Sequence, residues 1–157
     1  MKKVWLLALA LTSCAPTLNP TNRTVIHGVP VTYEVVSPGT LPPGMIGEAT
    51  PTPFGCRVRI DQAHVNMQNV AHELGHCLDG GRSRTFGRTG CVLRAYACDP
   101  REGYADTYAL VAAFCLGQDL GVLGWPGGAP GRPPAPESVT PELLQGGPWT
   151  RGARCPG

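Results

Sequence analysis

Two histidines and a glutamate near the middle of the chain have the types and the spacing that metal-assisted hydrolysis requires. His72 and His76 are four residues apart, so on a helix they lie on one face and both imidazoles can reach a single Zn²⁺. Glu73, beside the first histidine, can reach a water molecule at the same ion and accept its proton. This H-E-x-x-H pattern predicts zinc-dependent hydrolysis with Glu73 as the general base.

A third metal ligand is expected elsewhere, because a catalytic zinc usually has three protein ligands and one open position. Glu102 is the favoured candidate, on a second predicted helix. Asp106 lies one turn along the same face and could accept a hydrogen bond from the other ring nitrogen of His72, which would fix its tautomer. Two alternatives stay open: Glu102 also fits the third position of a capping box that starts at Asp99, and Asp106 or Asp79 could be the ligand instead.

Together the two patterns resemble the gluzincin metallopeptidases, in which H-E-x-x-H is followed by a helix with E-x-x-x-D. The second pattern is also similar to a helix of the small ImmA/IrrE-type metallopeptidases, through Glu102, Ala105, Asp106, Tyr108 and Ala109. The resemblance covers residues 56–117. It implies an α+β fold, a minimal zincin-like domain with a small β-sheet, an active-site helix and a second helix bearing the glutamate. It also implies a zinc metallopeptidase that acts on peptide or protein substrates.

Two helices are predicted to position these side chains, the first from its apolar periodicity and the second from its N-cap and first proline. Over residues 65–79 the apolar positions follow a helical period, and the histidines lie on the other side; these positions are Met67, Val70, Ala71, Leu74 and Leu78. A second helix is predicted from Pro100 to Leu116, with Asp99 as its N-cap. Tyr96, Tyr104 and Tyr108 are candidate oxyanion partners, but Tyr104 and Tyr108 lie on the side of this helix away from Glu102, which disfavours both.

Alternating apolar and polar residues predict strands over residues 29–35 and 56–60, with a loop over 37–55 between them. The second strand comes shortly before the H-E-x-x-H segment. The expected organisation is a signal peptide over 1–13, a tether over 14–23, a zincin-like domain over 24–123 and a Pro/Gly-rich tail over 124–157. The tail is expected to contain at most a short helix at 141–145.

The first residues predict export. A basic tip is followed by an apolar run too short to span a membrane, as in a secretory signal. Leu11–Cys14 resembles the lipobox of bacterial lipoproteins, which implies that Cys14 is lipidated and that the protein is exported to the cell envelope and anchored to a bacterial membrane. The alternative is an ordinary signal peptide with an incidental cysteine.

Cysteines are expected to form disulfides, because an even number follows Cys14 in a chain predicted to be exported. The candidates are Cys56, Cys77, Cys91, Cys98, Cys115 and Cys155. Their pairing does not follow from the sequence, although Cys91 and Cys98 are close enough to close a small loop. For Cys77, which follows His76 directly, a disulfide or a core thiol is favoured over a metal ligand.

The charge balance disfavours nucleic acid as a partner. Removing residues 1–13 takes away both lysines and leaves arginines and acidic residues nearly balanced. Arginines cluster after the H-E-x-x-H segment, where a solvated loop is favoured over a rim that recognises carboxylates; they are Arg82, Arg84, Arg88 and Arg94.

An enzyme is favoured over one alternative class, a catalytically silent, lipid-anchored binding module with a structural zinc. The intact Glu73 supports the enzyme, because a structural site has no use for a general base. His64 could assist an oxyanion but is more often a structural residue. The oligomeric state is not predicted.

Overall fold

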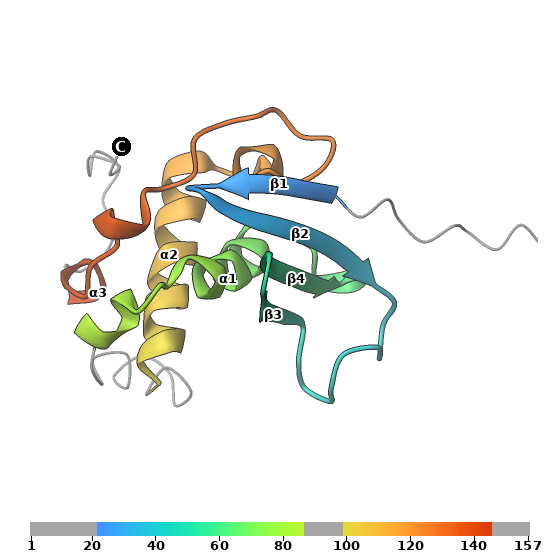
Figure 1. Ribbon diagram of the computed structural model, residues 1–157, viewed down its shortest axis with the longest axis horizontal. Helices are drawn as coiled ribbons and strands as arrows, with labels where there is room; N and C mark the ends of the chain where they lie inside the picture. The colour runs from blue at the N-terminus through green and yellow to red at the C-terminus, as the bar shows by residue number, and fades with distance from the viewer. Residues whose placement is uncertain (1–21, 87–98, 146–157) are drawn as a thin grey trace, which may run out of the picture.

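The first part of the chain that the computed structural model describes is a four-stranded sheet; the described residues are 22–86 and 99–145 (Figure 1). The strands are β1 (Asn22–Ile26), β2 (Val29–Val36), β3 (Gly47–Thr52) and β4 (Gly55–Asp61). Their order across the sheet is β1-β2-β4-β3, with β2 and β4 parallel and the other neighbours antiparallel. β3 is therefore an edge strand.

A tight turn joins β1 to β2 through His27 and Gly28. Both residues have positive φ, 47° and 80°, which a two-residue hairpin turn of type I′ requires. His27 is the one non-glycine residue with positive φ in the described chain. Its Nε2 contacts the carbonyl of Pro133 at 3.2 Å, so this side chain belongs to the scaffold.

The two predicted strands are confirmed, each to within one residue at either end. Alternate residues of both strands are buried in one core, namely Val31, Tyr33, Cys56, Val58 and Ile60. Apolar residues at every second position therefore mark the face of the sheet that packs on the helices, as the period of a strand requires.

The prediction of an uninterrupted loop over residues 37–55 is wrong, because β3 lies inside it. The sequence of β3 includes Gly47 and Pro51, two residue types that usually mark turns. None of its residues is fully buried, so it lacks the alternation of a half-buried strand. Proline is tolerated here because the strand is at the edge of the sheet. β1 was also not predicted, and it begins at Asn22, inside the segment expected to be a tether.

α1 (Met67–Leu78) contains the H-E-x-x-H segment and packs on β2, β3 and β4. Its N-cap is Asn66, whose side chain accepts a hydrogen bond from the N–H of Asn69 at 2.9 Å. The predicted helix and its apolar stripe are confirmed, since every residue of the stripe is at most 2% exposed. The stripe holds one side of α1 against the sheet and leaves the histidine side free for other contacts.

α2 (Pro100–Leu116) packs across α1, so that α1 lies between the sheet and α2 (Figure 1). Asp99 is its N-cap and Pro100 its first residue, as predicted. The two helices approach closely where Gly75 meets Ala105: a Cβ on Gly75 would lie 2.9 Å from the Cα of Ala105. The small residues on both helices allow this approach. The predicted α+β class is confirmed.

The described residues after Gly124 lie against this helical layer although they contain little regular structure. The hydroxyls of Tyr104 and Tyr108 donate hydrogen bonds to the carbonyls of Pro136 and Pro134 at 3.1 and 3.2 Å. Val139 is part of the core. The short helices here and elsewhere are η1 (Gln62–His64), η2 (Arg82–Thr85), η5 (Leu120–Leu123), η6 (Pro136–Ser138) and α3 (Glu142–Gln145).

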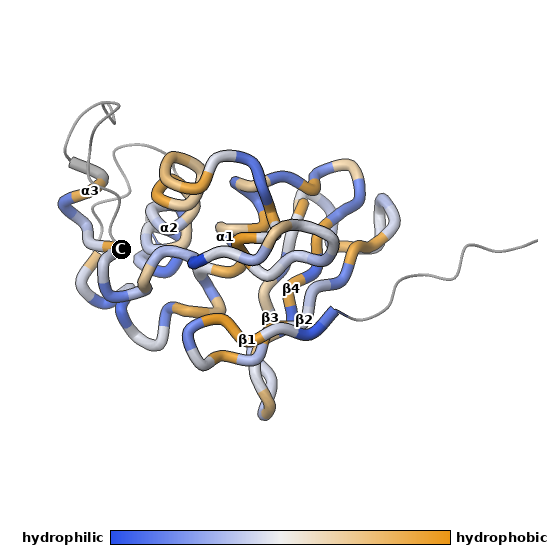
Figure 2. The backbone as a smooth tube through the Cα atoms, turned by 90° about the horizontal axis from the view of Figure 1, so that it is seen from above, coloured by the Kyte–Doolittle hydropathy of each residue, from blue (hydrophilic) through white to orange (hydrophobic). Residues whose placement is uncertain are grey.

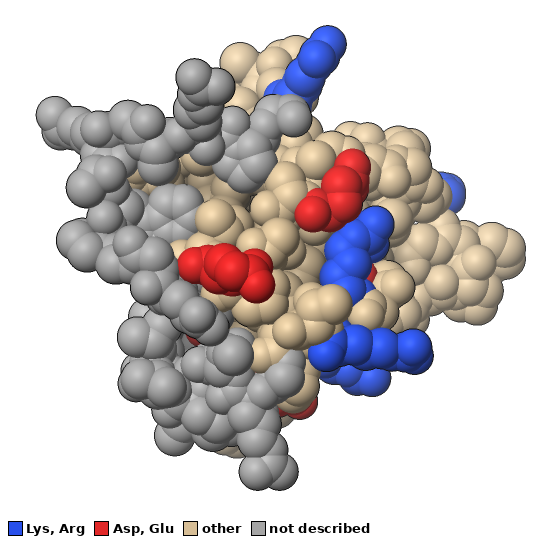
Figure 3. Space-filling model, turned by 90° about the vertical axis from the view of Figure 1, so that its left-hand side faces the viewer, with Lys and Arg blue, Asp and Glu red and all other residues tan. Residues whose placement is uncertain are grey.

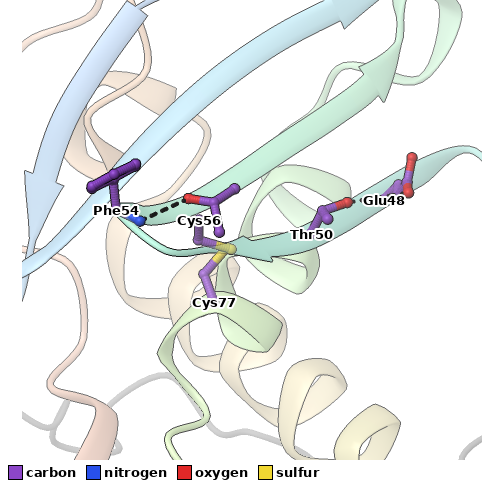
Figure 4. Close-up of a disulfide and its surroundings, with 6 residues drawn as sticks. Glu48, Thr50, Phe54, Cys56 and Cys77 are labelled. Carbon is purple, nitrogen blue, oxygen red and sulfur yellow. Dashed lines mark hydrogen bonds between the residues drawn. A yellow bond between two sulfur atoms is a disulfide. The ribbon is translucent and has the colours of Figure 1, made fainter.

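A disulfide between Cys56 and Cys77 joins β4 to the C-terminal half of α1 (Figure 4). The two Cα atoms are 5.7 Å apart. Cys115 is also disulfide-bonded. The prediction of disulfides is thus confirmed for these cysteines, whereas Cys91, Cys98 and Cys155 lie outside the described residues.

Hydrophobic residues, orange in Figure 2, lie in α1, α2 and the strands. On the face drawn in Figure 3, some acidic side chains of the described residues lie beside basic ones, while others lie apart from them. Within residues 22–86 and 99–145, no helix has the length and apolar character needed to cross a membrane. The predicted signal peptide, Cys14 and the last part of the tail lie outside these residues.

Candidate metal centre

His72 and His76 lie on the side of α1 that faces α2. Their rings meet edge to face with centroids 4.8 Å apart, and their Nε2 atoms are 3.2 Å apart. Both side chains are largely buried, at 16% and 21% exposed. The spacing of four residues therefore brings the two nitrogens together, as the sequence predicts.

Glu102 lies in the first turn of α2, and its carboxylate contacts both histidines. Oε2 is 3.1 Å from Nε2 of His72, and Oε1 is 3.4 Å from Nε2 of His76. These contacts hold the pKa of Glu102 well below its usual range. Together the three residues could hold a metal ion. Helix capping is supplied by Asp99, which accepts a hydrogen bond from the N–H of Arg101 at 2.9 Å.

Asp106 contacts the other nitrogen of His72, with Nδ1 and Oδ1 3.0 Å apart. In this arrangement Nδ1–H donates to the carboxylate and the lone pair of Nε2 points toward the group that could hold a metal. Burial alone lowers the pKa of His72, but the hydrogen bonds to Asp106 and Glu102 and the charge of Glu73 outweigh it and raise the pKa to about 9. Two carboxylates therefore hold the imidazole of His72 in place. A proton on its Nε2 would compete with a metal ion for that nitrogen.

The other candidate ligands have different partners. Asp79 accepts hydrogen bonds from the N–H and the hydroxyl of Ser83, at 2.6 and 2.7 Å, and so fixes the start of η2. The sulfur of Cys77 is bonded to Cys56. The third position beside the histidines is thus occupied by Glu102 rather than by either of these side chains.

Glu73 lies next to this group, between α1 and β3. It is 9% exposed, and burial raises the pKa of its carboxyl against the opposing effect of the two neighbouring histidines. Gly47 of β3 lies beside it, since a Cβ built on Gly47 would be 2.6 Å from Oε1 of Glu73. The side chain lines the same groove as His72 and His76, which is the position a general base would need.

The groove is open to solvent and has a volume of about 1270 Å³. One wall is the edge strand β3 with the preceding residues 44–46, and the other is the loop at the start of η2 with the first turns of α2. α1 forms the floor. Among the described residues, the histidine and glutamate side chains of the possible metal site therefore line a groove that is open to solvent.

Of the remaining sequence candidates within the described residues, Arg84 lines the groove and the others do not. Tyr104 and Tyr108 are fully buried and bonded to backbone carbonyls, which removes both as oxyanion partners. His64 is near Asp61, with Nδ1 and Oδ1 3.4 Å apart. Arg82 donates to the carbonyls of Leu78 and Asp79 at 3.0 and 3.2 Å, whereas Arg84 is exposed on the groove. Tyr96, Arg88 and Arg94 lie outside the described residues.

β3 and Gly47 are the parts of the site that sequence reasoning missed. Threonine at alternate positions, Thr50 and Thr52, is the only sign of a strand there. Nothing in the pattern around Gly47 relates it to Glu73, because the contact joins residues from separate elements. That contact depends on how α1 packs on the sheet.

Comparisons with known proteins add no relative to this geometry. No family model, curated protein or solved structure matches the chain. The resemblance to the gluzincins therefore depends on the two sequence patterns, and the function has to be inferred from the site itself.

Proposed function

We propose that this protein is a zinc-dependent metallopeptidase. The observation that supports it best is the close approach of the possible ligand atoms of His72, His76 and Glu102, one from each residue, which all lie within 4.8 Å of one another. The two Nε2 atoms are 3.2 Å apart, and the two carboxylate oxygens of Glu102 lie 3.1 Å from Nε2 of His72 and 3.4 Å from Nε2 of His76. For ligands at zinc–nitrogen and zinc–oxygen bond lengths, the edge of a tetrahedron is about 3.3 Å. Two imidazoles and one carboxylate also form a ligand set of catalytic zinc sites, with the fourth position left for water or substrate.

When bound, zinc would lower the pKa of water and polarise a carbonyl oxygen. Glu73 would accept the proton of the attacking water and deliver it to the leaving amine, which breaks the peptide bond. Its carboxylate faces the groove from a largely buried position. Asp106 would keep His72 in the tautomer whose Nε2 can act as a ligand.

The shape of the groove supports a peptide as the substrate. β3 pairs with β4 on one side only, so the backbone groups on its other side border the cleft. An extended peptide can bind to such an edge by adding a strand to the sheet. A peptide lying along β3 would pass over the histidine face of α1, where the hydrolytic groups lie.

We also infer that the protein is exported and anchored to a bacterial membrane through Cys14. The sequence of residues 1–14 supports this inference, and so does the disulfide between Cys56 and Cys77, because disulfides persist in oxidising compartments. An anchored peptidase would act on substrates in the cell envelope.

The test combines metal analysis with cleavage of a peptide library by the native protein and by Glu73→Gln. We expect one zinc per chain in both proteins, and hydrolysis by the native protein only. Cleavage at the native rate by Glu73→Gln would overturn the mechanism. Zinc binding by a native protein that cleaves nothing would favour the binding module instead.

A further inference from the structure

Gly47, the first residue of β3, lies directly against the side chain of Glu73. A Cβ at this position would be 2.6 Å from Oε1, 2.8 Å from Cγ and 3.0 Å from Cδ of Glu73. Cβ atoms in proteins essentially never lie within 3.0 Å of such atoms, so the distances to Oε1 and Cγ are too short for a side chain at residue 47. The space that a side chain of residue 47 would occupy is therefore filled by the Glu73 side chain.

The carboxylate of Glu73 is held in its position by packing. Among the described residues, no hydrogen bond or ion pair holds the Glu73 side chain, in contrast to Glu102 and Asp106, which contact the histidines. Glu73 has α1 beneath it and β3 beside it, and its remaining side faces the groove. The position of its oxygens thus depends on the surface that β3 presents.

We propose that Gly47 is a positioning residue for Glu73, in an inference that rests on the proposed peptidase function. Because residue 47 has no side chain, β3 can lie close to the side chain of Glu73, the proposed general base. A larger residue would push the carboxylate out of its place beside the histidines. The glycine is needed here for space and not for backbone conformation, since its φ is outside the positive region.

Gly47→Ala should therefore reduce catalysis more than it reduces stability. The atoms that an alanine Cβ would meet, from Cγ to Oε1, all belong to one flexible side chain, which can change its rotamer without a shift of the backbone. Misplacement of a reacting group by about 1 Å can lower the rate by about 100-fold. We expect kcat of Gly47→Ala to fall about 10- to 100-fold, with KM and the zinc content unchanged.

Gly131→Ala is the matched control. A Cβ there would overlap the side chain of Val122, at a position that does not line the groove. This variant should lose stability and keep its kcat. A fall of kcat in both variants would show that crowding by any added methyl group is responsible, and would overturn the proposal.

Two further comparisons, each made with Glu73 and with Glu73→Ala, test whether Gly47 acts through Glu73. With Glu73→Ala, the residual hydrolysis should be the same with glycine or alanine at residue 47. In the metal-free protein, Gly47→Ala should lower the melting temperature with Glu73 present and leave it unchanged with Glu73→Ala, because the atoms that the new Cβ meets are then absent. Equal effects of Gly47→Ala in both backgrounds would overturn the proposal.

The native protein in the same series separates the two possible failures. If it hydrolyses no peptide while binding zinc, the proposed function fails and the role of Gly47 fails with it. If it hydrolyses peptides and Gly47→Ala does so with unchanged kcat, the positioning role alone is wrong.

Discussion

His72 lies between two carboxylates, with Asp106 at Nδ1 and Glu102 at Nε2. In the metal-free protein these contacts stabilise the imidazolium, and the same atoms have to be free of protons to bind a metal. A metal ion, zinc in the proposed function, would therefore compete with protons for one side chain. The competition gives the site a pH dependence whose sign differs between the metal-free and the metal-bound protein.

We predict that the metal-free protein loses stability as the pH rises from about 6.5 to about 9. The pKa of His72 is raised from 6.5 to about 9 in the folded state, so the stabilisation is complete below the lower value and lost through the upper one. Glu102 has a lowered pKa, so its contribution is lost as the pH falls below its ordinary value of 4.5. Thermal unfolding from about pH 2 to pH 10 measures both effects. The variant His72→Ala should lose little stability between about pH 6.5 and about pH 9. A loss as large as that of the native protein would contradict the role given to His72.

Glu102→Gln should separate a metal ligand from a helix cap. Glutamine serves as well as glutamate at the third position of a capping box, but it lacks the negative charge that a zinc ligand supplies. We expect zinc affinity to fall by at least about 100-fold, as measured by competition with a chromophoric chelator. Asp99→Ala is the control: loss of the N-cap should lower the free energy of unfolding by about 1 kcal/mol while zinc affinity is kept. Equal zinc affinities in native protein and Glu102→Gln would exclude Glu102 as a ligand.

At the scale of elements, the site depends on the close packing of α1 and α2. The histidines come from one helix and Glu102 from the other, and Gly75 and Ala105 lie where the two helices touch. The separation of the helices therefore sets the separation of the ligand atoms. A change of one methyl group at this contact is expected to act on the metal site from a distance.

Gly75→Ala should reduce stability and metal affinity together. Its Cβ would lie 2.9 Å from a backbone atom of α2, so the helices have to move apart, at about 1–3 kcal/mol of stability. We expect a lower melting temperature and zinc binding weakened by 10-fold or more. Gly131→Ala, crowded at a position away from the site, should lower the melting temperature alone. If Gly75→Ala binds zinc as tightly as Gly131→Ala, the helix contact does not set the ligand geometry.

The elements near the site differ in how far the sequence predicts them. α1 follows from its apolar periodicity and α2 from the cap at Asp99 with Pro100 after it, because these are local patterns. β3 was not predicted, because an edge strand with little burial needs no alternation and tolerates Pro51. The contact of Gly47 with Glu73 is also beyond sequence reasoning, since it arises only when α1 packs on the sheet.

For the whole molecule, the disulfide between Cys56 and Cys77 connects the layer of the sheet to the helix that bears the histidines. It closes a segment with a sequence separation of 21 residues, which corresponds to about 3 kcal/mol of stabilisation in the chain-entropy model. The number of cysteines indicated disulfides, but the pairing could not be predicted, because many pairings fit the same count.

Replacing both cysteines, as Cys56→Ala with Cys77→Ala, should lower the free energy of unfolding by about 3 kcal/mol. Chemical denaturation in the presence and absence of a reductant measures it. A reductant should destabilise the native protein more than the double variant, which retains the other cysteines. An unchanged midpoint in the double variant would mean that this bond contributes nothing to stability.

The location of the protein can be tested on the full chain. Cys14→Ser should move the protein from the membrane fraction to the soluble exported fraction, because the proposed lipid attachment is lost. Fractionation and mass spectrometry of the N-terminus measure the change. A membrane-bound Cys14→Ser protein, or a native N-terminus without lipid, would contradict the proposed anchor.

The position of β3 at the sheet edge also bears on self-association of the protein. A sheet edge with free backbone donors and acceptors invites pairing with the edge of a second molecule, which leads to aggregation. Pro51 interrupts the row of donors in β3, because proline has no N–H. Self-association along the whole edge is thereby discouraged, while the part next to the histidines stays open. Replacing Pro51 would be expected to make the protein less soluble before it made it less active.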